Sequence, residues 1–162
     1  MRRRNPLLVV CLLFLLLAPL VAGAQTVMVY VSGTNHSDPY LLSAVEAGIM
    51  DSFFDAGIIV FNAGTYERVS DSDMQRHYWV RNTARQGGAT HAVEVEVDLS
   101  MNSGDRTAFD GASFRLVRVE PASVLGTGRV HASDVGARAG TAADEIGFRI
   151  GTEIARSALS QM

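Results

Sequence analysis

The spacing of hydrophobic residues predicts alternating strands and helices in the first half of the chain. Residues 26–31 and 58–61 are rich in β-branched and aromatic side chains, which is typical of buried strands. Between them, apolar residues recur at three- and four-residue steps and predict an amphipathic helix facing a core. Asp38 and Pro39 suit its N-cap and first turn, and Gly57 lies just past its end. Its expected apolar stripe comprises Leu42, Val45, Ile49 and Phe53, widened by Leu41, Met50 and Phe54.

A second helix is expected over residues 71–86, opened by a capping box of Ser70 and Asp73. Its expected apolar face comprises Met74, Tyr78 and Trp79, with Thr83 or Ala84. A last helix, over residues 142–160, is expected to open with Thr141 and Asp144 and to bury Ile146, Ile150, Ile154 and Ala158. Gly147 and Gly151 predict that this helix approaches the sheet closely.

Between these helices, residues 91–99 alternate valine with acidic side chains, which predicts a strand with one solvated face. Residues 101–111 are expected to form a turn or flexible loop. Residues 114–119 and 124–132 predict two further strands in an antiparallel meander. The element order is then β-α-β-α-β-β-β-α, an α/β (α+β) fold in which a mixed sheet is packed by three helices.

The N-terminal segment has the three parts of a secretory signal peptide. Arg2, Arg3 and Arg4 precede an apolar run, and Ala22-Gly23-Ala24 supplies small residues for cleavage. We therefore expect a signal peptide at 1–24 and one periplasmic or secreted domain at 25–162. Membrane contact is expected only if the N-terminal segment stays uncleaved as an anchor.

Processing changes the composition. Removing three of the 14 basic residues leaves 11 against 17 acidic ones, a formal charge of −6, and it also removes Cys11, the only cysteine. An acidic chain argues against nucleic-acid binding, which depends on basic side chains at the phosphates. Without cysteine, disulfides, thiol nucleophiles and thiolate metal sites are excluded from the mature chain.

Few residues suggest chemistry. Ser-x-x-Lys, Gly-x-Ser-x-Gly and dinucleotide-binding glycine motifs do not occur in a suitable context, and His36, His77, His91 and His131 show no zinc-ligand spacing. The sequence therefore indicates no catalytic residue, metal or cofactor. The best candidate ligand site is the segment between the first strand and helix, where free backbone N–H groups can hold an anion. It comprises Ser32, Gly33, Thr34, Asn35 and His36.

Glu94, Glu96 and Asp98 form an acidic row on one strand face. Residues two apart on a strand lie about 7 Å apart, too far to converge on one ion. We therefore expect a salt-bridged strand face, with partners on the following strands. The candidate partners are Arg115, Arg118 and Arg129.

Three features together resemble a known periplasmic superfamily. The helix over 41–56 runs into Gly57-Ile58-Ile59-Val60, residues 84–89 lead from a helix into the strand at 92–97, and the hairpin at 114–126 follows. This pattern resembles the α/β domain shared by curli-secretion CsgG-like proteins, flagellar FlgO-like proteins, LpoB-like activators of penicillin-binding proteins and the N-terminal domain of TolB. The resemblance covers roughly residues 26–160.

The resemblance implies a non-catalytic protein-binding or scaffold module in bacterial cell-envelope assembly, with an envelope protein as partner. It assigns no partner-binding residues. Two alternatives stay open at this point. One is a small periplasmic ligand-binding protein or enzyme that uses the 32–38 loop, with His36, Asp38 and a residue from 62–70 converging. The other is a homo-oligomer formed through a sheet edge or apolar helix faces.

Overall fold

A computed structural model describes residues 25–33, 38–102, 106–136 and 141–162. It confirms the predicted order of elements, five strands and three helices in these ranges. In chain order they are β1 (Thr26–Gly33), α2 (Pro39–Asp55), β2 (Ile59–Asn62), α3 (Asp73–Gln86), β3 (His91–Asn102), β4 (Arg106–Arg118), β5 (Ser123–His131) and α4 (Ala143–Leu159).

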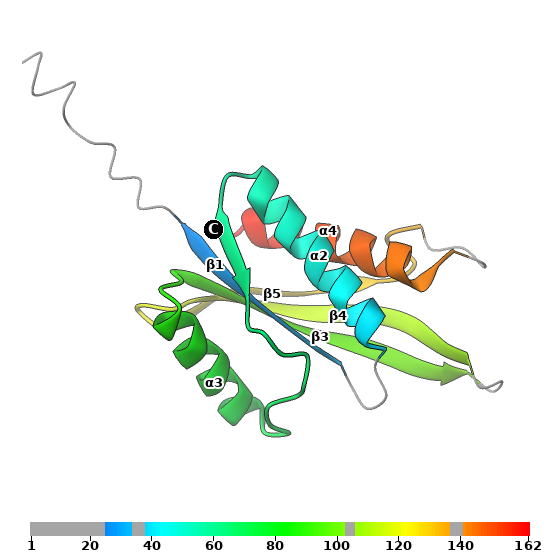
Figure 1. Cartoon of the computed structure of the whole chain (residues 1–162), viewed down its shortest axis with the longest axis horizontal. Coiled ribbons are helices and arrows are strands. Elements are labelled where there is room, and N and C mark those ends of the chain that lie inside the picture. The colour runs from blue at the N-terminus through cyan, green and yellow to red at the C-terminus, as the bar shows by residue number, and fades with distance from the viewer. Residues whose placement is uncertain (1–24, 34–37, 103–105, 137–140) are drawn as a thin grey trace, which may run out of the picture.

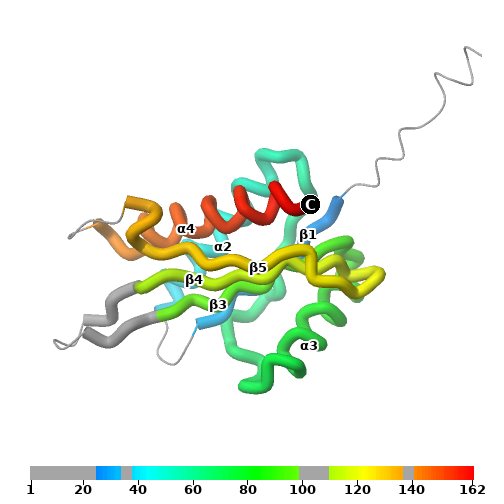
Figure 2. Tube along the Cα trace, turned by 180° about the vertical axis from the view of Figure 1, so that it is seen from behind, coloured from blue at the N-terminus to red at the C-terminus, as the bar shows by residue number. Residues whose placement is uncertain are grey.

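The strands form one mixed sheet in the order β2-β1-β3-β4-β5. β1 pairs in parallel with β2 and β3, whereas β3–β4 and β4–β5 are antiparallel, as the predicted meander requires. Helices α2 and α4 lie side by side on one face of the sheet, and α3 lies alone on the other (Figure 1). Seen from behind, α3 again lies on the opposite side of the sheet from α2 and α4 (Figure 2).

Local signals placed the first helix correctly. The Asp38 carboxylate accepts a hydrogen bond from the Tyr40 backbone N–H at 2.9 Å, and Pro39 is the first helical residue. Gly57 has φ 77°, the left-handed conformation expected just past a helix end. The predicted stripe is buried at Leu42, Val45, Ile49 and Phe53, but Phe54 is 73% exposed.

Three predictions about strands and caps were wrong. Residues 58–61 do not form a buried strand: β2 is a sheet edge, and Ile59 is 56% exposed. Residues 101–102 and 106–111 belong to strands and not to a loop, because β3 and β4 pair as far as Asn102 and Arg106, while the rest of the predicted turn, 103–105, lies outside the described residues. The helix caps also differ: α3 begins after Ser72 and α4 after Ala142, and neither cap residue makes a side-chain hydrogen bond to its helix.

The main core lies between the sheet and the α2–α4 layer. Val93, Val95 and Val97 of β3 point into it, as their alternation predicted. Gly147 and Gly151 approach α2 rather than the sheet: a Cβ on Gly151 would collide with the carbonyl oxygen of Val45, and one on Gly48 would collide with that of Phe148. The two helices therefore touch backbone to backbone.

We predict that Gly151→Ala destabilises the protein by about 1–3 kcal/mol, because backbone atoms of α2 cannot yield as a side chain can. This loss outweighs the gain of about 1 kcal/mol in helix propensity. Gly147→Ala is the matched control, since its Cβ would meet Leu41 and Ala44 at 3.0–3.1 Å, mainly side-chain atoms. Urea unfolding should show that Gly151→Ala is less stable than Gly147→Ala. Equal stabilities of the two variants would contradict a backbone contact at Gly151.

Candidate functional site

Helix α3 is attached to the sheet by a small second core. Val80 and Ala84 are its buried apolar residues, and they pack with Tyr30 of β1. The Tyr30 ring lies 5.4 Å from that of Trp79, and its hydroxyl donates to the Glu67 carbonyl at 2.8 Å. Only a small part of the α3 surface is therefore buried in apolar contacts.

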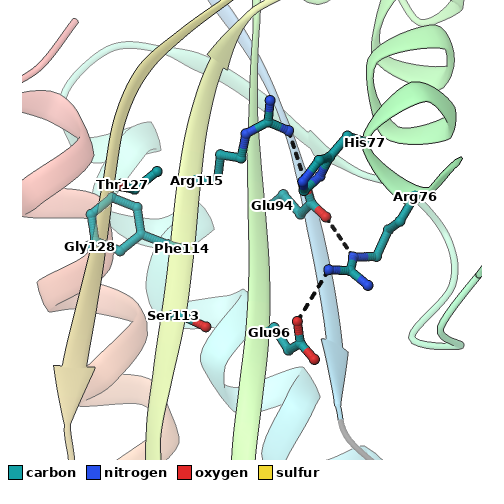
Figure 3. Close-up of a pocket in the computed structure, with 9 residues that line it drawn as sticks. All are labelled: Arg76, His77, Glu94, Glu96, Ser113, Phe114, Arg115, Thr127 and Gly128. Carbon is teal, nitrogen blue, oxygen red and sulfur yellow. Dashed lines mark hydrogen bonds and ion pairs between the residues drawn. The ribbon is translucent and has the colours of Figure 1, made fainter. Parts of the chain in front are cut away.

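A buried ion pair adds the second attachment. The Arg76 Nε donates to Glu94 Oε1 at 2.8 Å, and both side chains are buried. Its Nη2 lies 2.8 Å from the Asp73 carboxylate and 3.3 Å from that of Glu96. Arg76 and His77 reach from α3 toward β3, while Arg115 reaches toward Glu94 from β4 (Figure 3).

Two opposing effects act on the pKa of Arg76. Burial lowers it because the interior disfavours the charged form, whereas the hydrogen bond to Glu94 and the charges of Glu96, Glu94 and Asp73 raise it more. The net pKa of Arg76 lies above its usual range. The guanidinium therefore stays charged and remains paired with Glu94 and Glu96.

Beside this ion pair, α3 leaves the sheet face of β4 and β5 open. One cavity of about 310 Å³ lies over the ion pair, and a second of about 250 Å³ lies farther along α3. His77 and Arg115 line both cavities, so we treat the two as one α3–β4 groove. The first cavity is also lined by Arg76, Glu94, Glu96, Ser113, Phe114, Thr127 and Gly128. The second is also lined by Tyr78, Arg81, Val117, Ala122, Ser123 and Val124.

The acidic row forms the salt-bridged face that was predicted, with partly different partners. Arg115 lies 3.6 Å from Glu94, and Arg129 lies 2.5 Å from Asp98. Arg118 does not join the row, because it sits opposite His91 in the strand register. Arg76 and Arg68, which lies 3.0 Å from Glu96, come from outside the sheet and were missed.

The predicted apolar face of α3 was only partly right: Ala84 is buried and Trp79 packs against the second core, as expected, but Met74 and Tyr78 do neither. Met74 and Tyr78 are 78% and 64% exposed, whereas the buried face carries Arg76, Val80 and Ala84. The four-residue spacing of these three was the available signal, but an arginine in that series does not look apolar. Tyr78 instead stands at the groove, with the Arg81 guanidinium 5.8 Å from its ring centre.

The candidate ligand segment is only partly described. Ser32 and Gly33 end β1, and the buried Ser32 hydroxyl donates to the Val95 carbonyl at 3.4 Å. Thr34, Asn35 and His36 lie outside the described residues. Asp38 caps α2. The site at 32–36 therefore stays a prediction.

Of the other histidines, His77 lies in the groove, its Nδ1 2.6 Å from a Glu94 carboxylate oxygen, and His131 is exposed on β5. His91 is buried at the start of β3, and its Nε2 has no hydrogen-bond partner among the described residues. Burial lowers the pKa of His91, and the positive charge of Arg118 lowers it further.

The described ranges hold no cluster of three or more histidine, cysteine or acidic side chains arranged to bind a metal ion. In the same ranges, each helix is too short or too polar to cross a bilayer.

Comparison with known proteins finds similarity at the level of fold. No protein-family model matches the sequence, and a search of curated proteins finds no match. Two solved structures of PelC from Paraburkholderia phytofirmans, both dodecamers, have a similar fold, with TM-scores of 0.53 and 0.52 and sequence identities of 14% and 13%. The matches cover 85% of this chain and 89% and 87% of the PelC chains.

Two weaker matches are the lipoprotein GNA1162 from Neisseria meningitidis and TolB from Acinetobacter baumannii. Their TM-scores are 0.44 and 0.45, at 16% and 12% identity. The first match covers 83% of this chain and 99% of GNA1162, and the second covers 85% of this chain and 28% of TolB. The more specific resemblance to curli-secretion and flagellar proteins stays a prediction.

We predict that Arg76→Met lowers the free energy of unfolding by about 3 kcal/mol, since it leaves Glu94 buried without its main cation. Fluorescence of Trp79, the one tryptophan in the chain, reports the release of α3 during urea unfolding. The control is Arg149→Met, which breaks an exposed pair with Glu145 and is expected to cost no more than about 0.5 kcal/mol. Similar effects of the two substitutions would show that the buried pair does not hold α3.

We predict that His91 makes the protein less stable as the pH falls below about 6.5, the ordinary pKa of histidine. The unfolded chain then binds a proton that folded His91, with its lowered pKa, does not yet bind. Urea unfolding at pH 7, 6 and 5 should show a shallower decline for His91→Gln, while the exposed His131→Gln should follow the unmodified chain. A decline unchanged by His91→Gln would contradict the prediction.

Proposed function

We propose that this chain is an exported module of the bacterial cell envelope that binds another protein and does not act as an enzyme. The N-terminal leader pattern supports export. The fold itself is compatible with many functions, so the proposal depends on the surface.

The observation that carries the proposal is the open face beside α3. Tyr78 is 64% exposed on one side of the α3–β4 groove, and Val124 is 49% exposed on the other. Exposed aromatic and aliphatic side chains around a hollow that also contains arginine are typical of protein-binding surfaces. Met74 extends the exposed apolar surface along α3 by one turn.

The charged residues of the groove favour binding over catalysis. Glu94 is held by Arg76 and His77, and Glu96 by Arg76 and Arg68. A general base must have an oxygen free to accept a proton from the substrate, and carboxylates already paired with cations in this way are poorly suited to that role. The enzyme or ligand-binding alternative at the 32–38 loop remains the second hypothesis.

Self-association has separate support, because both PelC structures of similar fold are dodecamers. A homo-oligomer and a protein-binding groove are compatible. The experiment must therefore distinguish a second copy from a different protein.

We predict that a photo-crosslinking benzoylphenylalanine at Tyr78, in the full chain expressed in its native cells, captures a protein other than the chain itself. Phe54 is the matched control, since it is an aromatic residue 73% exposed on α2, on the other side of the sheet. Mass spectrometry identifies the product. Equal labelling from both positions, or adducts of the chain with itself alone, would overturn a hetero-protein role for the groove.

A further inference from the structure

We propose that the α3–β4 groove binds an extended peptide segment in which acidic and aliphatic side chains lie on the same side. This inference rests on the proposed protein-binding function and specifies the chemistry of the partner. Charge, surface character and shape each contribute to it.

The charge is the first step. No ion pair links Arg81 to any residue that the structure describes, although Arg68, Arg76, Arg129, Arg149 and Arg156 all have carboxylate partners there. Arg115 has one contact, to Glu94 at 3.6 Å, which is longer than the usual 2.7–2.9 Å of a charge-assisted hydrogen bond. Both arginines line the second cavity, and the described lining of that cavity includes neither aspartate nor glutamate. A positive hollow in a chain of net charge −3 favours an anionic ligand.

Part of the second cavity is aliphatic, although Tyr78 and Ser123 also line it. Val117 is buried in the groove, while Ala122 and Val124 line the β5 side. These aliphatic side chains suit contact with the side chain of leucine or valine. The ligand is therefore expected to combine carboxylates with aliphatic groups.

The shape favours an extended chain. The two cavities meet at His77 and Arg115, so the groove runs along α3 past the sheet face of β4 and β5. Small side chains, Ser113 and Thr127, line the first cavity, where larger ones would fill it. An extended peptide presents every second side chain to one surface, about 7 Å apart, and so can reach successive sites in such a groove.

The test uses fluorescein-labelled Asp-Ser-Leu-Ser-Asp-Ser-Leu and fluorescence anisotropy with the mature chain. Two peptides of equal length replace either both Asp by Lys or both Leu by Ser. We expect the first peptide to bind at least about tenfold more tightly than either of the others, and more weakly as salt is raised.

Variants locate the binding. Arg81→Gln and Arg115→Gln should each weaken binding about tenfold or more, as expected for loss of a hydrogen bond to a charged group. Arg85→Gln is the matched control: Arg85 is exposed one turn beyond Arg81 on α3 and does not line either cavity. Circular dichroism and Trp79 fluorescence show whether each variant keeps α3 folded against the sheet. Val124→Ser, which leaves the charge unchanged, should weaken binding of the first peptide and leave binding of the peptide with Ser in place of Leu unchanged.

Several outcomes would overturn the inference. They are equal binding of the Lys peptide, an equal effect of Arg85→Gln, and binding of polygalacturonate or phosphatidylglycerol vesicles in place of the peptide. Crosslinking from Tyr78 to another protein, together with no binding of the acidic peptide, would overturn only the partner chemistry. If position 78 forms no crosslink to another protein, the proposed protein-binding function itself is overturned.

Discussion

The ion pair between Arg76 and Glu94 determines how α3 lies on the sheet. The helix fully buries two apolar side chains, Val80 and Ala84, and partly buries Trp79, so its apolar contact with the sheet is small. A buried guanidinium is stable only while it stays with its carboxylates, because an unpaired charge in the interior is costly. The pair therefore fixes the rotation of α3 about its axis, and that rotation turns Tyr78 and Arg81 toward the groove and leaves Met74 in solvent.

Different interactions attach the helices to the two faces of the sheet. On one face, α2 and α4 touch through Gly48 and Gly151 and bury an apolar core in which close packing decides stability. On the other, a single helix is attached by one small apolar cluster and one charged network, and β4 and β5 stay uncovered. The first face therefore supports the sheet with a closely packed core. The second face presents a groove whose charged and apolar groups are carried by α3 and by that sheet.

The similarity of fold to PelC at 14% sequence identity illustrates how little the fold depends on particular surface residues. A sheet of mixed strands covered by helices needs apolar side chains at the right period, which many sequences supply. Binding specificity depends instead on a few side chains such as Arg81 and Arg115, and fold likeness says nothing about them. The protein-binding part of the proposed function therefore depends on the groove and not on the similarity of fold.

The sequence by itself determined the elements and most of the main core, because local patterns act within one element. Asp38 and Gly57 mark the helix ends through backbone chemistry, and the alternation at Val93, Val95 and Val97 identifies the core face of β3 without knowledge of its neighbours. Only the tertiary structure decided which strand lies at the edge, since burial of residues 58–61 depends on whether a second strand pairs with them. The groove could not be predicted for the same reason. Periodicity assigns burial by hydrophobicity, so it placed Met74 and Tyr78 inside, whereas the acidic row on a distant strand made Arg76 the buried residue.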